Sequence, residues 1–209
     1  LPEAEAHAMG ADRVESLLDW CLDLGIKYVT TYAFSTRNFE RPEAEKEALM
    51  EIYSRRFRRI AEDDRIHDNE VRVRTIGRRD GFPEKVVEAI EKAESATEDY
   101  DQFHLTLAIG YGGRAEIVDA AKRATKAVEE DEISPDEIDE KSLSSFMYAP
   151  ELSDPDLVVR TSGERRLSGF LTWHIPESKL HFSEKYWPEF EKEDLLEAIE
   201  TWRADSGRF

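Results

Sequence analysis

The order of apolar segments constrains the fold of this chain more than any other feature of its sequence. Short, β-rich apolar runs predict strands at 26–34, 71–76, 104–109, 157–160, 170–173 and 179–182. Apolar residues at helical spacing predict helices at 11–25, 43–63, 83–99, 115–130, 139–146 and 193–203. Because the strands alternate with helices, we expect an α/β fold with a mostly parallel central sheet and helices on both of its faces.

The domain organisation is simple. The 209 residues show no composition break, low-complexity tract or internal repeat, so we expect a single domain. In open parallel sheets, ligands bind where the strands end. The loops that follow the predicted strands are therefore the first place to look for chemistry.

The chain is strongly acidic: 29 Lys and Arg residues against 47 Asp and Glu residues give a net charge of −18. Such a surface repels a nucleic-acid duplex or an anionic bilayer, so we expect no nucleic-acid partner and no polybasic membrane anchor. The carboxylates are spread over the predicted helix surfaces, with no acidic tail. This pattern suits a halophilic protein with a hydrated surface in high salt, and it also suits an ordinary acidic cytosolic protein. We favour the halophilic interpretation.

Cysteine content and hydropathy indicate the compartment. Cys21 is the only cysteine of the sequence, which excludes an internal disulfide and a cysteine-rich zinc site and fits a reducing cytoplasm. No apolar stretch approaches the roughly 20 residues of a membrane span. The first residues show no signal-peptide pattern. We therefore expect a cytoplasmic protein.

Three loops that follow predicted strands have distinctive compositions: 35–42, 111–114 and 160–168. Hydroxyl groups, glycine amides and arginine side chains bind phosphate groups, and the first and third loops are rich in them. Composition alone leaves two interpretations open, a phosphate site and a solvated loop with salt-bridged arginines. A nucleotide-binding glycine loop and an H-E-x-x-H metal motif are both absent from the sequence.

The same loops resemble motifs of a known family. YAFSTRNFERP at 32–42 resembles YAFSTENW-RP, YGGR at 111–114 resembles NYGGR, and DLVVRTSGERRLS at 156–168 resembles DLLIRTSGE-RLSNF. Phe182 and WPEF at 187–190 resemble the block YF…WP-F. These blocks are similar to those of the cis-prenyltransferases, the family of undecaprenyl diphosphate synthase. They occur in family order and cover nearly the whole chain.

The resemblance implies an enzyme that condenses isopentenyl diphosphate repeatedly onto an allylic diphosphate, either farnesyl or geranylgeranyl diphosphate. Each new double bond is cis, and the product is a long-chain polyprenyl diphosphate, the precursor of a lipid carrier for glycan assembly. The resemblance further implies Mg²⁺ as cofactor, an undecaprenyl diphosphate synthase-like fold with an apolar tunnel, a homodimer, and peripheral membrane contact during product release.

Matching the motifs residue by residue gives particular side chains a role. The substrate-binding positions implied by the resemblance are His7, Ser35, Thr36, Arg37, Phe39, Arg41, Arg160, Arg166, Leu167 and Ser168. Among them, Arg160, Arg166 and Ser168 match the positions that hold the diphosphate of isopentenyl diphosphate. Asn38 matches the residue that helps remove a proton from the condensing isoprene, although an amide is a poor base and its role can also be positional. The positions that resemble the tunnel wall are Leu49, Met50, Tyr53 and Phe57, which by periodicity alone are core residues.

Two departures from the family pattern concern the metal. The catalytic block DGN-RWA, whose Asp binds Mg²⁺, lies upstream of the position matched by His7, and the sequence begins after it. We therefore expect residues 1–209 to be a cis-prenyltransferase domain that lacks its N-terminal first strand and its Asp-containing catalytic loop. Lys179 stands where the family commonly has a metal-binding Glu. On a strand, Glu177 would share the face of Lys179, so we expect Glu177 to substitute as a ligand.

Three functions remain open from the sequence. The leading hypothesis is a catalytic cis-prenyltransferase. The second is a non-catalytic partner subunit of a heteromeric enzyme, which Lys179 and the absent Asp block motivate and the intact substrate-binding arginines oppose. The third is a phosphate-binding α/β protein of another function. The last four residues, SGRF, loosely resemble the family's RRFG tail.

Overall fold

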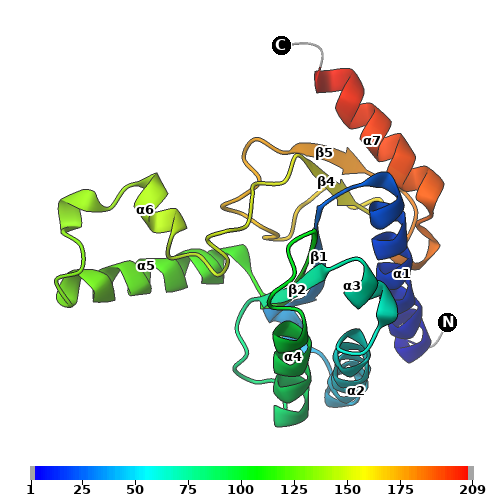
Figure 1. Ribbon diagram of the computed structural model, residues 1–209, viewed down its shortest axis with the longest axis horizontal. Coiled ribbons are helices and arrows are strands. Elements are labelled where there is room, and N and C mark those ends of the chain that lie inside the picture. Colours follow the sequence, from blue (N-terminus) through cyan, green and yellow to red (C-terminus); the bar gives the residue numbers. More distant parts are fainter. Residues whose placement is uncertain (1–2, 207–209) are drawn as a thin grey trace.

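The computed structural model describes the backbone of residues 3–206 and the side chains of residues 5–204 (Figure 1). The family-like tail at 207–209 lies outside the described residues. The helices are α1 (Glu3–Leu24), α2 (Glu43–Ile60), α3 (Asp64–Asp68), α4 (Glu84–Ala96), α5 (Gly113–Glu129), α6 (Glu140–Ser144) and α7 (Lys192–Ser206). The strands are β1 (Tyr28–Ser35), β2 (Val71–Ile76), β3 (Phe103–Tyr111), β4 (Leu157–Arg160) and β5 (Lys179–Phe182). Short 3₁₀-helices lie at Thr36–Glu40, Pro135–Glu137 and Trp187–Glu189.

The strands form two parallel sheets. In the first sheet β3 lies between β1 and β2, and in the second β4 pairs with β5. The predicted α/β fold with parallel strands and surrounding helices is therefore confirmed. It differs from a single central sheet in one respect: the edge strands β1 and β4 do not pair with one another within residues 3–206.

The two faces of the first sheet are covered differently. Leu105 and Leu107 of β3 pack into a core cluster with apolar residues of α1, α2 and α4. On the opposite face, Ala108 and Tyr111 pack against residues of the segment 148–175, which is mostly irregular. Helices α5 and α6 extend away from the sheets (Figure 1). Since successive strand residues point to opposite faces, β3 contributes to both cores.

One predicted strand is wrong. Residues 170–173 form consecutive turns rather than an extended strand. Gly169 and Leu171 have φ angles of 76° and 44°, in the left-handed region that an extended strand does not use. Leu171 is nevertheless buried, in the same cluster as Tyr111. The apolar pattern there predicted burial correctly, and the backbone conformation was decided by the packing of the turn.

Helix α1 begins earlier than the predicted start at residue 11 and includes Gly10. The Trp187 indole nitrogen donates a hydrogen bond to the Gly10 carbonyl at 2.8 Å. A Cβ at position 10 would lie 3.3 Å from the Trp187 ring, so the glycine permits this close approach. The helix ends at Leu24, before Gly25 with its φ of 67°, as the sequence predicts. Among residues 3–206, every helix is too short or too polar to cross a membrane.

Candidate active site

Three loops meet where the parallel strands end: the β1 loop (35–42), the turn after β3 at 112–113, and the β4 loop (160–171). The Gly113 amide donates to the Gly169 carbonyl at 2.8 Å. A Cβ on Gly112 would lie 2.8 Å from Thr36 Oγ1, so even an alanine there would require the Thr36 side chain to shift. Segments far apart in the sequence are thus joined at the carboxyl edge of the sheet, where ligands bind in folds of this class.

Hydrogen bonds within the β1 loop determine its shape. The Ser35 amide and hydroxyl both donate to Asn38 Oδ1, at 2.6 Å and 2.9 Å. The Phe39 ring packs edge-on against Phe34 and Phe82, with centroids 4.9 Å and 5.0 Å away. The loop is therefore preformed. The amide oxygen of Asn38 is already used to hold it, which favours the positional role over that of a base.

His7 and Arg41 come together through a residue that the sequence analysis missed. His7 Nε2 lies 3.0 Å from Glu45 Oε1 and 3.4 Å from Arg41 Nη1, and Arg41 also forms an ion pair with Glu45. The hydrogen bond from His7, aided by Arg41, lowers the pKa of the Glu45 carboxyl. The i,i+4 spacing of Arg41 and Glu45 at a helix start was the signal that could have identified this acid.

The β4 loop has an unusual backbone. Its residues with positive φ angles are Ser162, Gly163, Ser168, Gly169 and Leu171. For a residue with a side chain, each such conformation costs on the order of 1–3 kcal/mol and persists only where surrounding contacts impose it. Part of this loop is held by β5 and the residues after it, because the Gly163 amide donates to the Ser183 carbonyl at 2.9 Å. Strain of this kind clusters at ligand sites.

The structure separates the three arginines of the β4 loop. Arg160 ends β4, and its buried Nε has no hydrogen-bond partner among the described residues. Arg166 is exposed and paired with Glu164, whereas Arg165 is exposed and lies 3.9 Å from Glu184. A buried guanidinium donor without a partner is rare, and an anion would satisfy it. Arg160 is therefore the arginine that the fold prepares for a ligand.

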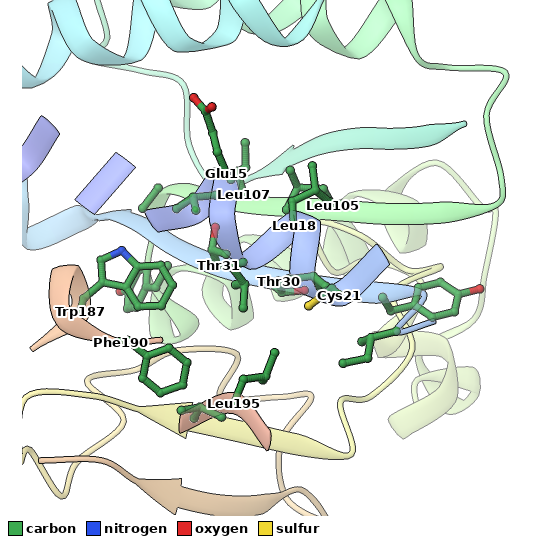
Figure 2. A pocket seen from close by; sticks show the side chains of 18 of the residues that line it. Glu15, Leu18, Cys21, Thr30, Thr31, Leu105, Leu107, Trp187, Phe190 and Leu195 are labelled. Carbon is green, nitrogen blue, oxygen red and sulfur yellow. The ribbon is translucent and has the colours of Figure 1, made fainter. Parts of the chain in front are cut away.

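A cavity of about 1030 Å³ lies between the two sheets, and Arg160 and Leu167 of the β4 loop form part of its wall. Figure 2 shows Leu18 and Cys21 of α1, Thr30 and Thr31 of β1, and Phe190 around it. Burial raises the pKa of the Cys21 thiol to about 12, so this residue is an apolar wall at neutral pH rather than a nucleophile. A space with apolar walls of this kind suits a long hydrocarbon chain.

Some predicted site residues line this cavity and others do not. Of the predicted tunnel residues, Leu49, Tyr53 and Phe57 line it, while Met50 is buried in the core away from its wall. Of the predicted substrate-binding residues, those at the wall are His7, Arg160 and Leu167. The remaining ones lie on the loops outside the wall, namely Ser35, Thr36, Arg37, Phe39, Arg41, Arg166 and Ser168.

Glu177 lies away from these loops. It is exposed in a turn that precedes β5, so it is not on the strand that starts at Lys179. Because Leu157 pairs with Lys179 and Arg160 with Phe182, Glu177 sits beyond the amino end of β5, whereas Arg160 is at the carboxyl end of β4. The Lys179 ammonium donates to the Trp202 carbonyl at 3.0 Å. Among the described residues, no three Asp, Glu, His or Cys side chains gather as metal ligands would.

Comparison with known proteins places this geometry in context. Residues 1–209 match the sequence model of one family, described as "Putative undecaprenyl diphosphate synthase". A relative from Methanopyrus kandleri, named tritrans,polycis-undecaprenyl-diphosphate synthase (geranylgeranyl-diphosphate specific), is 47% identical over 205 residues. That match covers 98% of this chain and 76% of the relative.

Two solved structures have the same fold. Lavandulyl diphosphate synthase from Lavandula x intermedia, in complex with dimethylallyl diphosphate, superposes with a TM-score of 0.90 at 33% identity, covering 96% of this chain and 86% of that one. A probable undecaprenyl diphosphate synthase from Campylobacter jejuni gives a TM-score of 0.80 at 32% identity, covering 93% of this chain and 88% of that one.

Proposed function

This chain belongs to the undecaprenyl diphosphate synthase family of prenyl-transferring enzymes, and we propose that it condenses isopentenyl diphosphate repeatedly onto an allylic diphosphate. The product is a long-chain cis-polyprenyl diphosphate, the precursor of a lipid carrier for glycan assembly. The observation that carries the proposal is the buried Nε of Arg160, which has no partner among the described residues and lies in the wall of an apolar cavity. Arg160 can then bind a diphosphate, and the apolar side chains of the same cavity can contact the growing chain.

The condensation needs two diphosphates held close together. The bond between the allylic carbon and its diphosphate breaks, a new carbon–carbon bond forms to isopentenyl diphosphate, and a proton leaves the added unit. Arg160, Arg166 and Ser168 bind the diphosphate of isopentenyl diphosphate, where a guanidinium fork matches phosphate oxygens. Leu49, Tyr53 and Phe57 receive the apolar chain. Asn38 holds the β1 loop in place through Ser35.

The primer we favour is geranylgeranyl diphosphate, with farnesyl diphosphate as the alternative. The name of the Methanopyrus relative specifies the former substrate. The test is incubation of the full-length protein with each primer, labelled isopentenyl diphosphate and Mg²⁺ in low and in high salt. Elongation with either primer supports the proposal, and better elongation with geranylgeranyl diphosphate supports the choice of primer. Absence of labelled product under all conditions contradicts the catalytic function.

Enzymes of this family use a divalent metal, and the described residues do not by themselves provide its site. Glu177 is exposed and remote from Arg160, so we assign it no step. We propose Mg²⁺ as the ion, with its main carboxylate ligand in polypeptide before Leu1. Because the described residues lack a complete metal site, a second candidate function is a non-catalytic subunit with the same fold. The incubation above distinguishes the two, because a subunit of that kind elongates nothing without a partner.

We also propose that a β-strand from the polypeptide preceding Leu1 fills the part of the cavity that lies between β1 and β4, while the part lined by Leu49, Tyr53 and Phe57 of α2 stays open for the apolar chain. Both strands are sheet edges, and the cavity is lined by consecutive residues of each, 28–33 and 156–161. Thr31 Oγ1 faces it as a buried polar atom without a partner among the described residues. A strand inserted there would join the two sheets into one.

The path of the chain supports this position. Helix α1 starts near the carboxyl edge of the sheet, since His7 reaches Arg41 just after β1. A strand leading directly into α1 ends at that edge and therefore runs parallel to β1, with α1 as the crossover helix. Relatives are long enough to supply it, because the matched region covers 76% of the Methanopyrus protein.

Hydrogen exchange in the full-length protein tests the strand. The His104 amide donates to the Lys27 carbonyl at 2.7 Å, so strand alternation directs the amides of Val29 and Thr31 toward β3 and those of Thr30 and Tyr32 toward the cavity. We expect all four amides to exchange slowly. Fast exchange of Thr30 and Tyr32 alone would show an open edge and contradict the proposal.

Assembly and environment complete the proposal. We propose a homodimer, supported by Val118 and Ile138, which are 49% and 42% exposed near the projecting helices α5 and α6. Sedimentation of the full-length protein should give twice the monomer mass, and a monomer would contradict the proposed homodimer.

We also propose a cytoplasmic, salt-adapted enzyme that touches the membrane when product leaves. A melting temperature that rises with potassium chloride is expected, because salt screens the repulsion within a chain of charge −18.

A further inference from the structure

A buried ionisable pair lies behind the β4 loop, outside the proposed chemistry. Glu116, in the first turn of α5, is 0% exposed, and His174 is 5% exposed. His174 Nε2 lies 3.9 Å from Glu116 Oε1, and its Nδ1 lies 3.2 Å from Asp154 Oδ1. The imidazole is thus placed between two carboxylates that come from different parts of the chain.

The surroundings of Glu116 keep it charged. Burial by itself raises the pKa of this carboxyl, but contacts from His174, the Tyr111 hydroxyl and the Tyr148 amide outweigh burial and lower the pKa. Two arginines also lie on this side: Arg78 is held by Asp119 at 2.7 Å, and Arg123 lies over the Tyr148 ring and donates to the Phe146 and Met147 carbonyls. The Tyr148 hydroxyl also donates to Asp119. A buried charge without a counterion is costly, so we take protonated His174 to be the counterion of Glu116.

This pair is attached directly to the β4 loop. The Gly113 amide, one turn before Glu116, donates to the Gly169 carbonyl at 2.8 Å. The His174 amide donates to the Leu171 carbonyl at 2.8 Å, within the turns that follow the loop. The pair consequently ties α5 to the end of the segment that carries Arg160 and Ser168.

We propose that Glu116 and His174 are positioning residues for the diphosphate-binding β4 loop, with protonated His174 holding the loop against α5. The inference rests on the proposed function, since it assigns the loop to isopentenyl diphosphate. Neither residue touches substrate. Their effect on binding passes through the strained backbone at Ser168, Gly169 and Leu171.

The direction of the pH effect follows from the charges. The carboxylate of Glu116, with a contribution from Asp154, raises the pKa of His174 above its ordinary 6.5. A group whose pKa is raised by folding stabilises the fold fully below 6.5, and that stabilisation is lost as pH rises through the folded value. Loop positioning and diphosphate binding should therefore weaken toward alkaline pH.

The test measures dissociation constants of the full-length protein for isopentenyl diphosphate between about pH 6 and pH 9. In the wild type we expect binding to weaken by roughly tenfold as His174 loses its proton, a change that corresponds to about 1.4 kcal/mol. His174→Gln, which keeps an amide donor but does not titrate, should lack this loss, so that its profile shows only the titration of the diphosphate itself. His104→Gln is the matched control, because His104 stacks on Tyr28 at the opposite end of the sheet and should keep the wild-type profile.

A titration of the imidazole by NMR gives a readout independent of substrate. Glu116→Gln should lower the midpoint of His174, and Asp154→Asn, at a more exposed carboxyl, should lower it less. Unchanged midpoints, or parallel pH profiles for the wild type and His174→Gln, would refute the positioning role while leaving the proposed function intact. Absence of isopentenyl diphosphate binding at every pH would refute both.

Discussion

The β1 loop and the β4 loop form one site by opposite means. In the β1 loop, Ser35 and Asn38 satisfy each other and Phe39 is packed into the core. In the β4 loop, residues adopt strained conformations and Arg160 keeps a buried donor without a partner. The β1 loop is held in place by contacts within the protein, whereas the β4 loop has a buried donor that a bound anion would satisfy. Unmet hydrogen bonding and strain, rather than packing, therefore mark where the ligand belongs.

The largest expected effect tests the unmet donor directly. Arg160→Ala removes a charged hydrogen bond to a buried anion, which costs about 2–5 kcal/mol, or roughly 30- to several-thousand-fold in the use of isopentenyl diphosphate. Binding of the allylic diphosphate should change far less. Arg165→Ala is the control in the same loop, since its side chain is exposed and lies 3.9 Å from Glu184. Steady-state kinetics with both substrates measures the difference, and equal losses for the two diphosphates would contradict the role.

The next effect tests the contact that holds the β4 loop. A Cβ on Gly113 would lie 2.6 Å from Thr172 Cβ and 2.7 Å from the Gly169 carbonyl oxygen, so Gly113→Ala must displace the backbone of this segment. Overpacking of this kind costs about 1–3 kcal/mol. We expect a lower melting temperature together with a higher KM for isopentenyl diphosphate. Gly25→Ala is strained by its φ of 67° but meets nothing within 4 Å, so it should lower stability and leave KM unchanged.

A smaller effect tests the hydrogen bonds that hold the β1 loop. Asn38→Ala removes the acceptor of the Ser35 amide and hydroxyl, and loss of such a local cap costs about 1 kcal/mol. Asn38→Asp keeps an acceptor at the same place and should retain most of the stability. Chemical denaturation compares the two variants. If Asn38→Asp were as unstable as Asn38→Ala, the loop would not depend on these hydrogen bonds.

The smallest effect concerns Glu45, which contacts both His7 and Arg41 at the end of the β1 loop. Folding lowers the pKa of this carboxyl, so its contribution is present above its ordinary 4.5 and is lost as pH falls through the folded value. Glu45→Gln should cost below about 1 kcal/mol at neutral pH, as for other partly exposed ion pairs. Melting temperatures of the two proteins should converge at low pH, and a constant gap would exclude the linkage.

Local signals explain why much of the fold could be predicted. The apolar run before Ser35 and the alternation of strands and helices are period-dependent patterns, and they gave β1, β2 and β3 in parallel order. The predicted strand at 170–173 was wrong because its apolar residues are buried in turns. Periodicity reports burial, and it cannot separate a buried turn from a buried strand.

The candidate site could be predicted from the sequence only in part, because local patterns do not report contacts between distant segments. Motif resemblance identified Arg160 and the two loops, yet nothing local separated the cavity-wall residues Leu49, Tyr53 and Phe57 from Met50 on the same helix. Glu45 and the Glu116–His174 pair escaped because each depends on a partner far away in the sequence. Glu177 looked like a ligand in the sequence, and its turn lies beyond the amino end of β5, away from Arg160.

By itself the sequence determined the α/β class, the parallel order of strands and helices, and the loops that carry the family's motifs, because hydrophobic period and loop chemistry are written in neighbouring residues. Only the tertiary structure decided which arginine of the β4 loop keeps an unmet donor, where the cavity lies, and which acids face His174. Those properties arise from distances between segments that the chain brings together only on folding, and a separation in space leaves no trace in local composition.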